Sequence, residues 1–159
     1  MLGATGQGIA MNVTVEDAVF DGNVATNSGG AIYVSQGDLS LSDATFTGNE
    51  ARQGGALLGS LIEIRDAAFR DNTSTAGGGA IAQTGLSTLT IRDSEILRNG
   101  DGLGGAVLTW GAPVSLVNVD LGTGADENRL DDINANSNLY SWDGSGVVTV
   151  DCDGQANCQ

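Results

Sequence analysis

Carboxylates and arginines are the side chains of this sequence that could do chemistry. The 159 residues include 20 acidic residues and six arginines, with no lysine and no histidine. Two carboxylates placed roughly 5 to 9.5 Å apart across a cleft could act as acid and base in hydrolysis of a glycosidic bond. A lyase mechanism would instead need a basic residue beside acidic groups. Glu63 with Arg65 and Arg92 is the charged cluster that best fits such a site.

Four aspartates recur at similar positions of a repeated pattern, namely Asp17, Asp43, Asp66 and Asp93. If these carboxylates lay one strand spacing apart, neighbours would repel by about 0.9 kcal/mol in water. Either each aspartate accepts backbone N–H groups at a bend, or a cation lies between them. We expect the bend, because aspartate commonly caps turns in this way. With the aspartates explained as turn residues, we assign no residue of the sequence to catalysis.

The C-terminal part is rich in hard oxygen ligands and contains both cysteines. The weak calcium candidates are Asp126, Asp131, Asp132, Asp151 and Asp153. The spacing of an EF-hand loop is absent, so a solvated acidic loop is the expected reading, and bound Ca²⁺ remains the alternative. We expect Cys152 and Cys158 to form a small disulfide in an exported protein, since a metal site would need further cysteine or histidine ligands. No cofactor is otherwise expected.

The overall charge and hydropathy exclude two classes of partner. A formal net charge of −14 repels phosphate backbones, so nucleic acid is not an expected partner. No apolar run approaches the roughly 18 residues of a membrane span, so this segment is not expected to insert into a membrane. The chain enters its repeated pattern almost at once, and we expect it to be part of a longer parent chain.

A short motif occurs four times, beginning with "FDGNVATNSGGAIY" at Phe20. Its second glycine falls at Gly30, Gly55, Gly79 and Gly105, which are 25, 24 and 26 residues apart. A period near 25 residues that tolerates small insertions is typical of a solenoid whose coils differ in their loops. Each Phe is preceded by alternating aliphatic and polar residues, as in "VTVEDAVF" and "LSLSDATF", which predicts a strand with one buried face.

Stacking of such coils predicts a parallel β-helix in which equivalent residues form columns. We expect a ladder of hydrogen-bonded amides at Asn23, Asn49, Asn72 and Asn99. We expect a core stack at Phe20, Phe46, Phe69 and Ile96. The glycines Gly30, Gly55, Gly79 and Gly105 are expected at coil corners, where positive φ or tight packing is needed.

The strand after the glycines is ambiguous, because both of its alternating sets are partly apolar. We favour the column that contains Ile32 and Leu57 as the inward one. If the set that contains Ala31 and Tyr33 faced inward, the Ile32 column would form an exposed apolar stripe suited to a partner.

These motifs resemble the repeats of the chlamydial polymorphic outer membrane proteins. The first motif matches as Gly-Gly-Ala-aliphatic at 29–32, 54–57, 78–81 and 104–107, and the second as Phe-x-x-Asn at 20–23, 46–49 and 69–72. The sequence departs from the pattern at Ile96, which replaces Phe, and in the fifth coil, which lacks the glycine motif. The resemblance extends to the right-handed parallel β-helix repeat proteins of bacterial surfaces, in the pectate-lyase-like fold class. It implies a secreted or outer-membrane surface protein of a bacterium, often one used for adhesion.

The predicted fold is therefore all-β, a right-handed parallel β-helix of about five coils with an irregular C-terminal cap. The β-helix is expected over residues 1–121, with a partial coil at 1–11, coils near 12–37, 38–60, 61–86 and 87–112, and a partial coil at 113–121. Residues 122–159 are expected to form an acidic capping segment with a hairpin and the disulfide. Its apolar residues Leu130, Ile133, Leu139, Tyr140 and Trp142 would cover the last coil.

Three functions follow from this reading. The first is a non-catalytic surface module for adhesion or structure, with a host-surface, glycan or protein ligand, because folding alone explains every repeated residue. The alternative is a polysaccharide-active lyase or glycoside hydrolase, which would need residues beyond the fold itself. The third is an ice-binding solenoid, but Glu63 interrupts the polar column that would have to bind ice. That column contains Thr14, Ser40, Glu63, Thr90 and Ser115.

Overall fold

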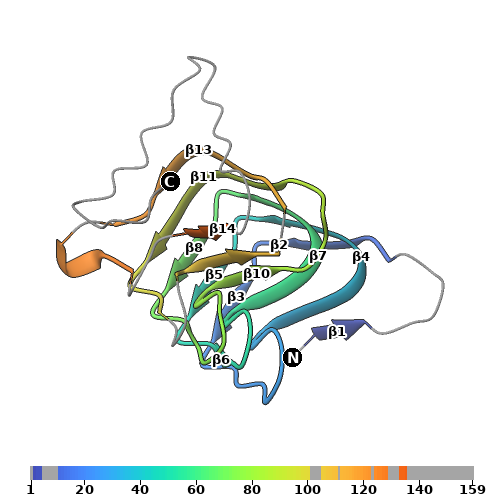
Figure 1. Cartoon of the computed structure of the whole chain (residues 1–159), viewed down its shortest axis with the longest axis horizontal. Coiled ribbons are helices and arrows are strands. Elements are labelled where there is room, and N and C mark those ends of the chain that lie inside the picture. The colour runs from blue at the N-terminus through green and yellow to red at the C-terminus, as the bar shows by residue number, and fades with distance from the viewer. Residues whose placement is uncertain are drawn as a thin grey trace.

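The computed structural model describes residues 2–4, 11–100, 105–110, 112–122, 124–128 and 133–135 (Figure 1). In this part of the chain the structure is almost entirely β, with a single turn of 3₁₀ helix at Gly124–Asp126. The strands are β1 (Leu2–Ala4), β2 (Val13–Glu16), β3 (Val19–Asp21), β4 (Ile32–Ser42), β5 (Thr45–Thr47), β6 (Glu50–Ala51), β7 (Leu57–Arg65), β8 (Ala68–Arg70), β9 (Thr73–Ser74), β10 (Ile81–Gln83), β11 (Leu89–Leu97), β12 (Val107–Thr109), β13 (Val114–Asp120) and β14 (Ile133–Ala135).

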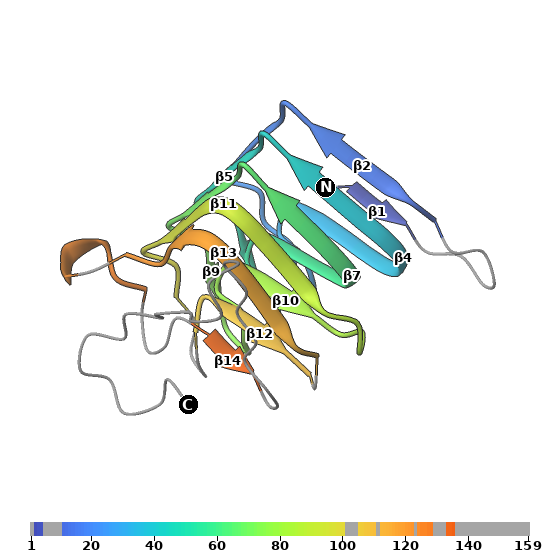
Figure 2. The ribbon, with the colours of Figure 1, turned by 90° about the horizontal axis from the view of Figure 1, so that it is seen from above.

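Every strand pairing in the described chain is parallel, and the strands stack coil upon coil (Figure 2). The first wall consists of β2, the second half of β4 and of β7, the first half of β11, and β13. The second wall contains β3, β5, β8 and the end of β11. The third wall contains β1, the start of β4 and of β7, then β10, β12 and β14. This arrangement confirms the predicted parallel β-helix.

Register places like residues on like residues, as the repeat predicted. Phe20 pairs with Phe46, and Phe46 pairs with Phe69, at the centre of the second wall. Ile96 follows in the same column, because it pairs with Phe69. The three rings stack with centroids 4.7 Å apart in each pair and with interplanar angles of 8° and 4°. The ring spacing equals the strand spacing, so stacking and strand pairing reinforce each other.

The third wall faces the core with its branched aliphatic column. Ile32, Leu57, Ile81 and Val107 are fully buried and belong to the core cluster, as do the alanines that precede them. Leu58 and Ala82, on the alternate face of these strands, are buried but lie outside that cluster. The Ile32 column is therefore the inward one, in agreement with the expectation from sequence.

The described coils continue past Leu121, where the sequence pattern placed the end of the repeats. β14 pairs with β12 so that Ile133 lies against Val107, in the column of Ile81 and Leu57. Ile133, expected in an irregular cap, is thus part of a regular third-wall strand. Its neighbours lack the Gly-Gly-Ala motif, and for this reason the sequence pattern alone did not reveal the strand. In the described residues, no helix is long and apolar enough to cross a membrane.

Candidate binding surface

The corner aspartates stand where the chain bends from the first wall to the second. Asp17, Asp43, Asp66 and Asp93 have φ between 48° and 51°, and Asn118 has φ 53°. This left-handed conformation is costly for most L-residues, but aspartate and asparagine adopt it more readily than others. The residue type at this column is therefore explained by backbone geometry.

The expected capping by these carboxylates is not what the structure shows. Within the described residues, no backbone N–H donates to the side chains of Asp17, Asp43 or Asp66. Among the described residues, a side-chain hydrogen bond along the column runs from Asn118 Nδ2 to Asp93 Oδ1, at 2.8 Å. No group of three or more Asp, Glu, Cys or His residues in this part of the chain is arranged to hold a metal ion. The left-handed turn, rather than a side-chain cap, accounts for the column.

The asparagines form a continuous ladder with a fixed direction. The backbone N–H and Nδ2 of Asn49 both donate to Asn72 Oδ1, each at 2.9 Å, and Asn72 donates in the same way to Asn99 Oδ1. Asn23 donates likewise to Asn49 Oδ1. The Nδ2 groups of Asn49, Asn72 and Asn99 also donate to a carbonyl of the preceding coil, as Asn72 does to Phe46 O at 3.0 Å. Asn49, Asn72 and Asn99 are fully buried, so these bonds satisfy amides that have no access to water.

Asn128 adds a fifth member that the sequence pattern missed. Asn99 donates its backbone N–H and Nδ2 to Asn128 Oδ1 at 2.8 and 3.1 Å. Asn128 in turn donates to Ile96 O, one coil back, at 2.7 Å. It follows Leu121 by seven residues instead of three, because the 3₁₀ turn is inserted between them. The signal that could have found it is the position of an asparagine one period after Asn99.

The paired glycines serve two different purposes. Gly54 has φ 60°, so the first glycine of the motif supplies a left-handed residue. Gly55 has no such φ, but a Cβ there would lie 2.0 Å from Gly79 O of the next coil. The second glycine is therefore needed for close approach of stacked backbones. Gly30 and Gly79 show the same close approach, while Gly105 has φ 77°.

The outer face of the first wall carries the polar column and the arginine pair noted in the sequence. Thr14, Ser40, Glu63, Thr90 and Ser115 are in register on successive strands. Arg65 and Arg92 are also in register on β7 and β11, and both are exposed. Neither arginine forms an ion pair with any described residue. The structure thus brings Glu63, Arg65 and Arg92 together on one exposed face.

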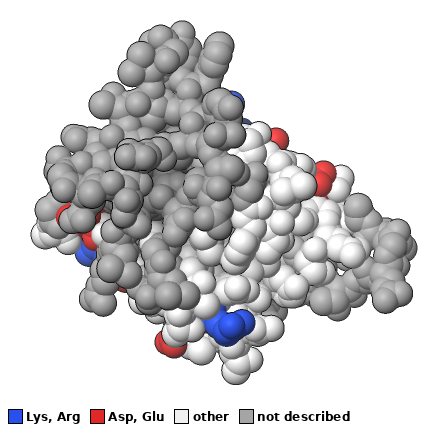
Figure 3. All heavy atoms as spheres, viewed as in Figure 1, with Lys and Arg blue, Asp and Glu red and all other residues white. Residues whose placement is uncertain are grey.

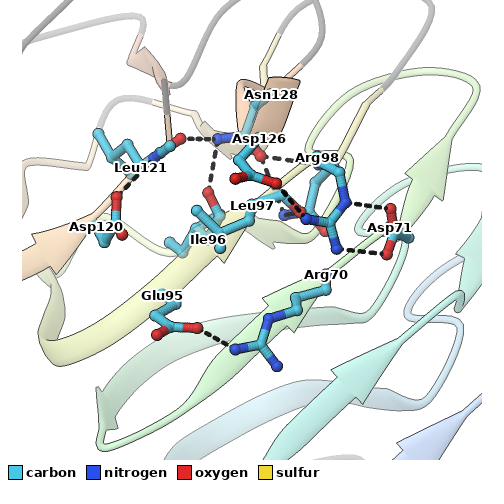
Figure 4. Close-up of polar contacts among 12 residues, drawn as sticks. Arg70, Asp71, Glu95, Ile96, Leu97, Arg98, Asp120, Leu121, Asp126 and Asn128 are labelled. Atoms are coloured by element: carbon cyan, nitrogen blue, oxygen red, sulfur yellow. Dashed lines mark hydrogen bonds and ion pairs between the residues drawn. The ribbon is translucent and has the colours of Figure 1, made fainter. Parts of the chain in front are cut away.

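A second charged cluster connects three coils beside the second wall (Figure 4). Arg98 forms a two-bond contact with Asp71, from Nε to Oδ1 at 2.9 Å and from Nη2 to Oδ2 at 3.0 Å. Its Nη1 donates to Asp126 Oδ1 at 2.6 Å. Arg70 pairs with Glu95 on the same face. The side chains of these pairs are partly exposed, so solvent screens the charges and each pair adds little to stability.

The ion pairs of Arg98 shift the pKa values of Asp71 and of Arg98 itself. The hydrogen bond from Arg98 lowers the pKa of Asp71 below its usual value, against a smaller opposing effect of burial. The bonds to Asp71 and Asp126 raise the pKa of Arg98 further above its already high value. Asp126, one of the calcium candidates, is therefore held by an arginine.

A shallow polar recess of about 370 Å³ lies at the bend between the first two walls. Its lining includes the carboxylates of Asp93, Glu95 and Asp120 together with Asn118. Glu95 is already paired with Arg70, and Asn118 with Asp93.

On the face of the molecule drawn in Figure 3, the described atoms are mostly uncharged, with few acidic or basic groups. The remaining site candidates, Asp131, Asp132, Asp151, Asp153, Cys152 and Cys158, lie outside the described residues, as do Leu130, Leu139, Tyr140 and Trp142.

Comparison with known proteins supports the repeat assignment. The family model of the Chlamydia polymorphic membrane protein repeat matches twice, at residues 17–35 and 66–84. Each match begins at a corner aspartate and runs through a complete Phe-x-x-Asn and Gly-Gly-Ala unit. A Dictyostelium discoideum protein, metabotropic glutamate receptor-like protein R, is 34% identical over 89 residues, which are 53% of this chain and 6% of that protein. The chain thus spans a small fraction of this curated relative.

No solved structure matches the chain. The two repeat matches and the stacked parallel strands agree, since each matched stretch folds as one corner, one second-wall strand and one third-wall strand. The chain is thus a parallel β-helix repeat protein in which two stretches match the Chlamydia polymorphic membrane protein repeat.

Proposed function

We propose that this chain is a non-catalytic module of a bacterial cell-surface or outer-membrane protein that binds a host-surface, glycan or protein ligand through its outer faces. The observation that supports this is the use made of the repeated polar residues. The asparagines satisfy one another inside the coil, and the corner aspartates occupy left-handed turns. Folding therefore explains both columns without a catalytic role. The repeat that matches this chain is that of the Chlamydia polymorphic membrane proteins.

The outer face of the first wall is the surface best suited to contact a ligand. Its strands run side by side through five coils, and it presents hydroxyls, Glu63 and the two exposed arginines at a regular spacing. Repeat proteins use such extended faces because a long ligand can contact several coils at once. Loops between the motifs differ from coil to coil and would add selectivity at the margins.

Binding can be tested with the purified, fluorescently labelled chain on immobilised neutral and acidic polysaccharides and on cultured cells. We expect saturable binding that Ser40→Arg and Thr90→Glu on the first wall weaken at least about tenfold, which corresponds to about 1.4 kcal/mol. Arg52→Ala is the matched control, because Arg52 is exposed beside the β6 strand and away from the first wall. Treatment of the cells with protease or glycosidase distinguishes a protein ligand from a glycan. Absence of saturable binding to every surface would contradict the proposal.

A polysaccharide-active enzyme is the second candidate, because Arg65 and Arg92 lie together on an exposed strand face beside Glu63. A basic side chain near a carboxylate is the minimum that a lyase would need. Incubation with pectins and other acidic glycans should give no unsaturated product if the chain is a binding module. Product formation that Arg92→Ala abolishes and Arg52→Ala preserves would instead establish catalysis at this pair.

A further inference from the structure

Two arginines, Arg65 and Arg92, lie next to each other on the outer face of the first wall. They are in register on the adjacent strands β7 and β11, so their backbones are one strand spacing apart, roughly 4.8 Å. Both residues are exposed, and neither forms an ion pair with a described residue. Like charges this close repel each other. The stacking of the coils thus concentrates positive charge at one place on a chain whose formal net charge is −14.

The register explains why this arginine pair has no partner in the neighbouring coils. Arg98, by contrast, meets the carboxylate of Asp71 in the preceding coil. In the column of the arginine pair, the position before it is Ser42 and the position after it is Val117. Neither residue can neutralise a guanidinium group. The pair therefore remains open to an anion from outside the described chain.

The surroundings of the arginine pair are polar and rich in hydroxyl groups. Glu63 precedes Arg65 by two residues, so both lie on the same face of β7, and Thr90 is the neighbour of Glu63 on β11. Ser40 and Ser115 continue this column on the flanking strands. Carboxylate and hydroxyl groups can hydrogen-bond to sugar hydroxyls, whereas guanidinium groups bind oxyanions through two parallel bonds. The face thus complements a sugar that also carries an anionic group.

We propose that Arg65 and Arg92 form a subsite for the carboxylate or sulfate groups of an acidic polysaccharide. This proposal rests on the proposed function of the first wall as a ligand-binding face. The anionic group binds both guanidinium groups, and Glu63 and Thr90 bind sugar hydroxyls beside it. An acidic peptide would match the arginines but offers few hydroxyls to the rest of the column.

The overall charge of the chain restricts where such a ligand can bind. A net charge of −14 repels polyanions at long range, so adsorption without a specific site is disfavoured. At about 0.15 M salt this repulsion is screened beyond roughly 8 Å, whereas contacts with the arginine pair persist. Binding of an acidic polysaccharide should therefore depend on these two side chains.

The test measures the affinity of the purified chain for polygalacturonate, which carries carboxylates, and for dextran sulfate, with neutral dextran as the comparison, in about 0.15 M NaCl. We expect at least one acidic polysaccharide to bind, and neutral dextran to bind at least about tenfold more weakly. The double variant Arg65→Gln, Arg92→Gln should lose at least about tenfold in affinity for the acidic ligand. The matched control Arg52→Gln removes a single exposed arginine away from the first wall, and should change affinity less than about twofold.

Replacing both arginines by lysine distinguishes two-bond recognition from charge alone. We expect an intermediate loss, because lysine keeps the charge but not the planar fork of donors. Circular dichroism melts show whether each variant is folded, as substitution of exposed side chains should allow.

Two results would refute the subsite. One is the absence of binding to both acidic polysaccharides, and the other is binding that the double glutamine variant retains. Neither refutes the proposed surface module, which still stands if neutral glycans or cells bind both chains equally. Polyglutamate identifies the other kind of ligand: if it binds as tightly as the polysaccharides and with the same dependence on the arginine pair, the ligand is an acidic protein and the proposed polysaccharide is wrong.

Discussion

Asn72, in the middle of the ladder, forms hydrogen bonds with both its Oδ1 and its Nδ2. Its Oδ1 accepts two bonds from Asn49, and its Nδ2 donates to Asn99 Oδ1 and to Phe46 O. The side chain has no exposed surface, so no water can replace a lost partner. A buried amide in this position is worth more than a surface one, because its removal leaves the partners unsatisfied as well.

We expect Asn72→Ala to lower the free energy of unfolding by roughly 3 kcal/mol or more, since it leaves two buried donors of Asn49 without acceptors. Asn23→Ala is the matched control at the end of the ladder. It removes a donor from Asn49 Oδ1 but orphans no donor, so about 1 kcal/mol or less is expected. Urea unfolding followed by circular dichroism compares the two. Equal losses would mean that the ladder does not act through burial.

Asp71 should make stability depend on acid pH. Its pKa is lowered in the folded chain by the hydrogen bond from Arg98. The stabilisation is therefore fully present above the unfolded-state pKa of about 3.9, and it is lost as pH falls through the lower folded-state value. We expect Asp71→Asn to be less stable than the original chain at neutral pH, by a few tenths of a kcal/mol for so exposed a pair.

The difference between the two chains should shrink as the pH falls below the unfolded-state pKa of about 3.9 towards the lower folded-state pKa of Asp71. Urea unfolding at a series of pH values measures it. Asp38→Asn is a suitable control, because no ion pair of Asp38 with a described residue is present. A difference that is independent of pH would exclude the ion pair as its cause.

At the scale of the element, the strands are short because each coil must turn three times within about 25 residues. The first bend uses a left-handed aspartate or asparagine, and the third wall begins after a glycine pair. Two further left-handed positions precede the ladder at Gly22 and Gly48, whose counterparts in later coils are Asp71 and Arg98. Arg98 adopts φ 56° while its guanidinium pairs with two carboxylates, so ion pairing offsets the strain of that conformation.

The glycines of a coil should differ greatly in their tolerance of a methyl group. Gly55→Ala would place Cβ 2.0 Å from Gly79 O, and neither backbone can move without breaking the stack. We expect this change to prevent folding or to cost more than about 4 kcal/mol. Gly48→Ala has no atom within 4 Å of the new Cβ and costs only its left-handed conformation, about 1 kcal/mol. Thermal melts of the two variants test this order, and a stable Gly55→Ala chain would contradict the observed coil spacing.

At the scale of the whole molecule, the main feature is the excess of acidic over basic residues. Arg52, Arg65 and Arg92 form no ion pair with a described residue, and Arg129 lies outside the described residues. The 20 acidic residues far outnumber the six arginines. A net charge of −14 on a small solenoid repels itself, and salt screens that repulsion over roughly 10 Å at about 0.1 M.

We therefore expect the melting temperature to rise between about 10 mM and about 150 mM NaCl, since screened repulsion outweighs the few exposed ion pairs. Calorimetry with CaCl₂ at matched ionic strength separates screening from binding. A further rise specific to Ca²⁺ would indicate a cation site. A fall with NaCl would show that the ion pairs of Arg70 and Arg98 dominate.

The sequence by itself determined the period, the parallel stacking and most of the columns, because every coil must place the same residue at the same height. The phenylalanine stack and the inward Ile32 column could be read in this way. The alternation of motifs identified the coil even though no single motif is specific. The sequence pattern did not reveal Asn128 as a ladder residue or β14 as a strand, because both keep the register of the coils but lack the repeated motif.

Only the tertiary structure decided why particular residues stand at the corners. The aspartates follow from φ near 50°, and Gly55 follows from the carbonyl of Gly79, which is distant in sequence and adjacent in space. The pairing of Asp126 with Arg98 likewise depends on coils that no local pattern brings together. The repeat specifies the column, but the backbone angles and the neighbouring coil specify what each side chain in it does.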